Sequence, residues 1–208
     1  MKNTGRLICV LLTVVILGCG EGGKGFSIKG MMKTANETKA MSILKMLQTA
    51  SAVYQCEREG IYGTIKELHD SGGMISESIY QAWDRQEKPT PISGYLVADI
   101  ATDSGGIPLN RRERSGFAAY PVKPGVTGDS IILMLCDQRN LKAPQGGEGG
   151  FVSHGEEWTF FKADYAKIGG PVRCFPGDNE LRTKWTALKK YTPQEGLEEA
   201  KKISNQAR

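Results

Sequence analysis

The apolar residues of this chain change their spacing once, near residue 94, and this change limits the fold more than any other feature. Upstream, one stripe about five turns long recurs at helical spacing and consists of Ala40, Ile43, Leu44, Leu47, Ala50 and Tyr54. Downstream, short apolar runs alternate with segments rich in turn-forming residues. One long helix followed by such strands predicts an α+β fold.

Helix boundaries follow from capping signals. The long helix is predicted to begin at a capping box formed by Thr34 and Glu37 and to end at Gly60. Three further helices are predicted over residues 64–70, 76–83 and 192–203. The first begins at a second capping box, formed by Thr64 and Glu67. The last begins at a third capping box and has proline at its first helical position.

The downstream half predicts an antiparallel sheet of about four strands. The four strands occupy residues 94–101, 116–122, 130–137 and 157–164, and residues 171–175 add a short edge strand. Turn-rich segments separate neighbouring strands, which favours antiparallel pairs over helical crossovers.

The first residues have the layout of a secretory signal. Met1 to Arg6 carries two positive charges, and Leu7 to Leu17 is an uncharged run in which only Thr13 is clearly polar. The run is about half of the roughly 20 residues that a membrane-spanning helix needs. An exported protein is therefore predicted.

The order Ile16-Leu17-Gly18-Cys19 resembles the bacterial lipobox. The resemblance implies a signal peptide over 1–18, acylation of Cys19 as the new N-terminus, a flexible glycine-rich tether over 19–33 and a single domain over 34–208. It also implies that membrane lipid is the partner of Cys19, at the periplasmic or extracellular face of the cell envelope. Gly20 in place of aspartate favours the outer membrane. An ordinary secretory signal and an uncut apolar anchor are the alternatives.

Charge and cysteines exclude several classes of protein. Loss of Lys2 and Arg6 with the signal lowers the net charge from +4 to +2, so no nucleic-acid partner is predicted. The folded part keeps Cys56, Cys136 and Cys174, which permit one disulfide or burial as small apolar side chains. No CxxC spacing occurs, so zinc, redox and haem motifs are not indicated.

No catalytic, cofactor-binding or metal-binding residue is predicted, and the chain is expected not to be an enzyme. The alternative is an envelope glycan hydrolase that uses Glu156, Glu157 or Asp164, since histidines and carboxylates come close in sequence only at His69, His154, Glu156, Glu157 and Asp164. Trp185 is a candidate for a binding surface, because it lies in a polar stretch.

The order of elements resembles the head domain of type IV pilins and pseudopilins. The resemblance rests on residues 40–68, where the helix runs into Gly60-Ile61-Tyr62-Gly63-Thr64, and on the strands 94–97 and 116–121. It implies a long helix packed on the sheet, a structural or interaction role with an envelope protein partner, or an accessory place in a type II secretion or type IV pilus-like apparatus. Gly30 stands where pilins carry a glutamate, which implies a lipid-tethered head that does not polymerise.

Overall fold

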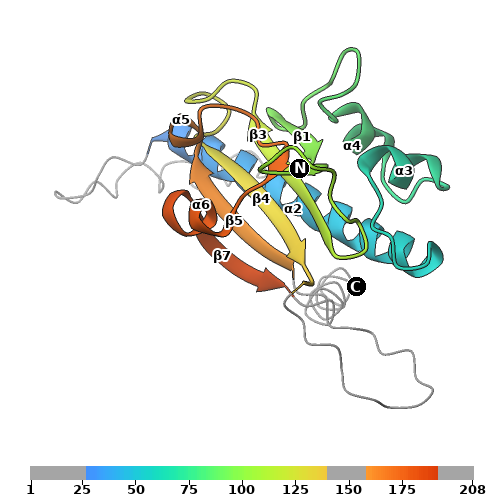
Figure 1. Cartoon of the computed structure of the whole chain (residues 1–208). Coiled ribbons are helices and arrows are strands. Elements are labelled where there is room, and N and C mark those ends of the chain that lie inside the picture. The colour runs from blue at the N-terminus through green and yellow to red at the C-terminus, as the bar shows by residue number, and fades with distance from the viewer. Residues whose placement is uncertain (1–26, 140–157, 192–208) are drawn as a thin grey trace, which may run out of the picture.

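The computed structural model describes residues 27–139 and 158–191 and shows one long helix lying over an antiparallel sheet (Figure 1). The helices are α2 (Ile28–Glu57), α3 (Ile65–Asp70), α4 (Glu77–Gln81), α5 (Tyr165–Ile168) and α6 (Asp178–Lys184). The strands are β1 (Tyr95–Asp99), β2 (Thr102–Asp103), β3 (Arg114–Pro121), β4 (Ser130–Asp137), β5 (Trp158–Asp164), β6 (Cys174–Phe175) and β7 (Thr186–Tyr191). The predicted α+β class is confirmed.

The long helix α2 begins six residues before the predicted capping box, so the predicted start at Thr34 is wrong. The Thr34 hydroxyl donates to the Gly30 carbonyl oxygen at 3.1 Å, a bond typical of a helix interior. Glu37 instead accepts from Lys162 Nζ of β5 at 2.6 Å. Residues 28–33, predicted as part of the tether, are therefore the first turns of the helix.

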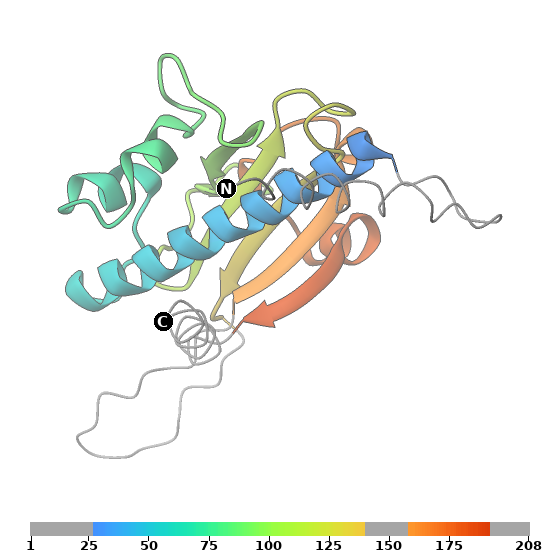
Figure 2. The same cartoon turned by 180° about the vertical axis from the view of Figure 1, so that it is seen from behind.

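The predicted apolar stripe of α2 is buried in the core that the helix shares with the sheet. Figure 2 shows α2 lying across the sheet. The helix ends at Glu57, and Gly60 has a φ of +83°, a conformation that glycine adopts without steric cost. The predicted end is thus confirmed to within a few residues.

The main sheet has five strands in the order β1-β3-β4-β5-β7, all antiparallel to their neighbours. The four predicted strands are β1, β3, β4 and β5. Because the side chains of a strand alternate between faces, β4 presents Ile132, Met134 and Cys136 to α2 and Ile131, Leu133 and Leu135 to the opposite face. Both faces are buried, which explains why β4 is a continuous apolar run.

The face opposite α2 is covered by the chain between β5 and β7 and by the segment before β3. Leu109, Val172, Phe175 and Trp185 pack there against the sheet. β6 pairs with β2 in parallel, and Arg173 forms an ion pair with Asp84 at 2.9 Å. These contacts hold the covering segment in place.

The fifth strand, β7, was not predicted. Its sequence contains Lys189 and Lys190, as is common on an edge strand, where charges discourage pairing with other chains. Trp185, the residue before this strand, is buried, so its predicted place on a binding surface is wrong.

Several predictions concern the rest of the chain. The signal peptide 1–18, the lipidation site Cys19 and the C-terminal helix 192–203 lie outside the described residues. Within the described ranges, no helix combines the length and the apolar character needed to cross a membrane.

Candidate functional site

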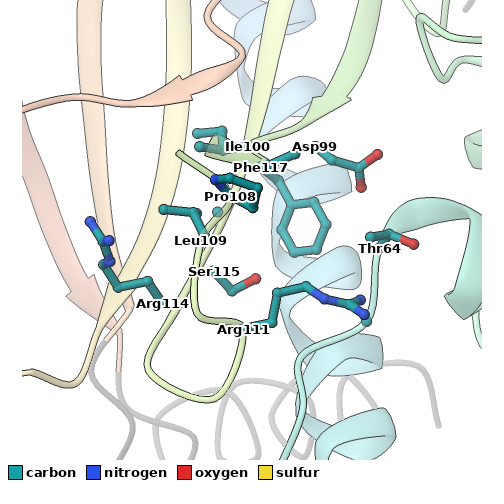
Figure 3. Close-up of a pocket in the computed structure, with 12 residues that line it drawn as sticks. Thr64, Asp99, Ile100, Pro108, Leu109, Arg111, Arg114, Ser115 and Phe117 are labelled. Atoms are coloured by element: carbon teal, nitrogen blue, oxygen red, sulfur yellow. The ribbon is translucent and has the colours of Figure 1, made fainter. Parts of the chain in front are cut away.

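The candidate site is a pocket of about 190 Å³ where the N-terminus of α3, the end of β1 and the start of β3 meet (Figure 3). It is lined by Gly63, Thr64, Asp99, Ile100, Ala101, Pro108, Leu109, Arg111, Arg114, Ser115, Gly116 and Phe117. The strands and α3 are parts of the packed core, so the positions of these side chains are defined by the fold.

One wall of the pocket is the N-terminus of α3, which has the predicted capping box. Thr64 N donates to Glu67 Oε2 at 2.8 Å, and Glu67 N donates to Thr64 Oγ1 at 3.3 Å. Arg111 donates to the same Glu67 oxygen and, at 3.2 Å, to the Tyr62 carbonyl oxygen. Burial raises the pKa of Glu67, but the hydrogen bonds from Arg111 and Thr64 outweigh it and lower this pKa overall.

Asp99, the last residue of β1, is the buried acid of the pocket. Its Oδ1 accepts from Ile65 N at 2.6 Å, the first backbone N–H of α3. Burial raises the pKa of Asp99 to about 6, and the bond from Ile65, the charge of Arg85 and the Trp83 indole oppose this rise only in part. The carboxyl group of Asp99 therefore changes its charge near pH 6.

The floor of the pocket is the start of β3. A Cβ atom at Gly116 would meet Leu135 Cδ2 at 2.7 Å and Ile100 Cδ1 at 3.1 Å, so glycine allows these two side chains to pack closely against β3. In Figure 3 the Phe117 ring lies between Asp99 and Arg111, and the Ser115 hydroxyl points toward Arg111. Pocket walls of this kind combine an apolar surface with a few polar groups.

Arg114 lies on the far side of the pocket from Arg111. Its guanidinium carbon lies 5.4 Å from the centre of the Phe175 ring, within the range of a cation–π contact. Its Nε is buried and has no hydrogen-bond partner among the described residues.

The arrangement of the pocket is suited to binding. The pocket combines apolar side chains with one carboxyl group whose charge depends on pH. The cavity has room for a small ligand group or a partner side chain. Within the described part of the chain, Asp99 is the sole carboxylate lining the pocket, and no group of three histidines, cysteines or carboxylates is placed to hold a metal ion.

Asp164, the described member of the hydrolase hypothesis, does not line this pocket. Asp164 ends β5, and its Oδ1 accepts from Ala166 N at 2.9 Å as the N-cap of α5. His154, Glu156 and Glu157 lie outside the described residues. Trp158, which follows them, is separated from Asp164 by the full length of β5, about 20 Å at 3.3 Å per residue.

His69, the other candidate, joins α3 to α4. Its ring stacks on Tyr80 with centroids 3.8 Å apart, and Nε2 lies 2.9 Å from Glu77 Oε2. Hydrogen bonds with Asp70 and Glu77 raise the pKa of His69. These contacts account for its position without a ligand.

Within the described residues, no disulfide joins Cys56, Cys136 and Cys174. Cys136 is buried with its Sγ 3.2 Å from the Tyr62 hydroxyl, whereas Cys56 and Cys174 are exposed. Of the two predicted roles, burial as a small apolar side chain therefore applies to Cys136 alone.

Asp99 was not among the residues predicted from the sequence. A signal was present, because Asp99 has the same parity as the buried Tyr95 and Val97 of its strand. An acidic side chain on the buried face of a strand indicates a partner from another element, here Ile65.

Comparisons with known proteins add no relative. Neither the protein-family models, nor the curated proteins, nor the solved structures yielded a match.

Proposed function

We propose that this chain is a lipid-anchored protein of the bacterial cell envelope whose head domain acts as a structural or interaction module and not as an enzyme. The single observation that carries the interaction role is the pocket at Asp99, whose buried carboxyl group and apolar walls suit recognition. The anchor is supported by the order Ile16-Leu17-Gly18-Cys19 at the end of an export signal.

The proposal includes a pilin-like origin of the head. It is supported by the packing of α2 across β3 and β4, which is the arrangement that the resemblance implies. An accessory place in a type II secretion or type IV pilus-like apparatus is the second candidate. Co-purification with a pilin-like partner from the native host would favour it, and consistent isolation without one would count against it.

The hydrolase alternative receives no support from the described geometry. A glycosidase needs two carboxyl groups about 5–9.5 Å apart across the scissile bond. Asp164 is a helix cap, one strand length from Trp158.

Mass spectrometry of the mature protein from its native host tests the anchor. We expect an N-terminal Cys19 carrying acyl chains and partition of the protein into detergent. Cys19→Ser should abolish acylation, whereas Cys9→Ser, a matched change inside the signal, should leave it intact. An unmodified Cys19, or cleavage after Gly25, would refute the anchor.

Incubation of the purified protein with envelope glycan tests the absence of catalysis. We expect no release of soluble fragments, and no difference between the wild type and variants carrying Glu156→Gln, Glu157→Gln or Asp164→Asn. Release that falls at least about 100-fold in one of these variants would establish the hydrolase instead.

A further inference from the structure

Exposed apolar side chains gather at one end of the molecule. Ile28, Met31 and Met32 on the first turns of α2 are 77%, 53% and 61% exposed, and Val126 in the turn between β3 and β4 is 56% exposed. Figures 1 and 2 both place this turn beside the N-terminal end of α2. Isolated exposed apolar residues are ordinary, but a group at one end of a fold indicates a contact surface.

This end is held together by contacts between α2 and the turn. Asn36 Nδ2 donates to the Thr127 carbonyl oxygen at 2.8 Å, and Lys33 Nζ lies 2.9 Å from Asp129 Oδ1. Tyr165 N, at the start of α5, donates to the Asp129 carbonyl oxygen at 2.8 Å. The apolar side chains therefore sit on a framework built from three elements.

Basic residues occur on the same elements as the apolar ones and on α5, which contacts the turn. Lys29, Lys123 and Lys167 are exposed, and none of them forms an ion pair with a described residue. Lys167 also lines a shallow hollow of about 310 Å³, whose charged lining includes Asp129 and Asp164 as well as Lys162 and Lys184. Lys162 and Lys184 are paired with Glu37 and Glu180, so Lys167 is the lysine of this hollow that can contact lipid phosphate. An apolar patch with a basic rim is typical of protein surfaces that lie on phospholipid.

The chain length between the anchor and this end is short. Eight residues lie between Cys19 and Ile28, and the nine steps that join these two residues span at most about 32 Å at 3.3–3.6 Å per step. If Cys19 is acylated, the exposed start of α2 is therefore kept close to the bilayer.

We propose that the anchor-side surface, formed by Ile28, Met31, Met32 and Val126 with Lys29, Lys123 and Lys167, rests on the phospholipid bilayer that holds the acylated Cys19. The apolar side chains enter the headgroup region, and the lysines contact lipid phosphates. The inference rests on the proposed lipid anchor and adds an orientation to it.

The orientation directs the pocket away from the membrane. β3 runs from Arg114, at the pocket, to Pro121, next to the turn that carries Val126, a rise of about 23 Å. Asp99 and its neighbours therefore face partners in the surrounding compartment.

Tryptophan quenching by brominated lipid tests the contact. The mature, lipidated full-length protein is reconstituted into vesicles of phosphatidylethanolamine and phosphatidylglycerol with brominated acyl chains. We compare Met32→Trp with the matched control Val53→Trp, because Val53 is also exposed, at 47%, but lies near the other end of α2. The native Trp83, Trp158 and Trp185 are buried and provide a common background.

We expect the added emission in Met32→Trp to be quenched at least about twofold and that in Val53→Trp to be unchanged. If brominated lipid quenches the added tryptophan to the same extent in both variants, the proposed orientation is wrong. The added tryptophan of Met32→Trp could instead be protected from aqueous iodide without being quenched by brominated lipid. This result would indicate that a second copy of the chain covers the surface, and it would also refute the membrane contact.

Co-flotation of the same samples separates the two proposals. Protein that floats with the vesicles but shows no quenching retains the anchor and refutes the surface contact. Wild-type protein isolated from the host that does not float with the vesicles refutes the lipid anchor itself.

Discussion

Asp99 shows how a single residue links burial, charge and stability. Its pKa is raised from 3.8 to about 6 in the folded protein, so the folded state binds the proton more tightly than the unfolded chain does. The stabilising contribution of this proton is complete below about pH 4 and is lost as the pH rises through 6. Loss of that contribution costs on the order of 3 kcal/mol.

We therefore predict that Asp99→Asn becomes more stable relative to the wild type as the pH rises. The difference in free energy of unfolding should change by about 3 kcal/mol in favour of the variant between pH 4 and pH 7.5, because the amide keeps an acceptor for Ile65 N and lacks the charge. Urea denaturation at both pH values measures it. The exposed Glu87→Gln is the control and should stay within about 0.5 kcal/mol of the wild type.

Two threonines with the same sequence pattern have different roles. Thr64→Ala should lower the free energy of unfolding by about 1 kcal/mol, because Thr64 caps α3. Thr34→Ala should be neutral or slightly stabilising, because Thr34 lies inside α2, where alanine is the better helix former. Thermal unfolding of the two variants checks both; a loss at Thr34 equal to that at Thr64 would contradict the described start of α2.

At the scale of elements, the face of the sheet opposite α2 depends on a segment whose strand was not predicted. Trp185 packs into that face just before β7, although its neighbours in sequence are polar. Because the Trp185 side chain is buried on this face, the segment that leads into the edge strand β7 contributes to the hydrophobic core.

We predict that Trp185→Ala destabilises the protein by about 3–5 kcal/mol, since it removes a large buried side chain. Leu188→Ala, on the adjoining strand and 41% exposed, should cost less than about 1 kcal/mol. Guanidinium denaturation compares the two. If Trp185→Ala kept full stability and lost only a binding partner, the surface role suggested by the sequence would be restored.

At the scale of the whole molecule, the three described cysteines report on the fold. We predict that a maleimide labels Cys56 and Cys174 in the native protein and reaches Cys136 only after unfolding, because Cys136 lies beneath α2 in the core. Mass spectrometry with and without denaturant measures this. Rapid labelling of Cys136 in native conditions would contradict the packing of α2 on the sheet.

The local sequence determined the α+β class, the apolar stripe of α2, the capping box at Thr64 and four of the five strands of the main sheet. These features depend on residues that lie a few positions apart in the sequence. Apolar periodicity and capping signals are therefore sufficient to predict them. The export signal belongs to the same group of local patterns and remains a prediction.

The tertiary structure decided the features that depend on distant contacts. α2 starts at Ile28, and its N-terminal half is held by two ion pairs. Lys33 pairs with Asp129 of the turn before β4, and Glu37 pairs with Lys162 of β5. β7 is a strand because β5 offers a partner edge, although its own sequence is polar. The pocket exists because Asp99 meets the backbone of Ile65, 34 residues earlier in the chain, and no local pattern specifies that meeting.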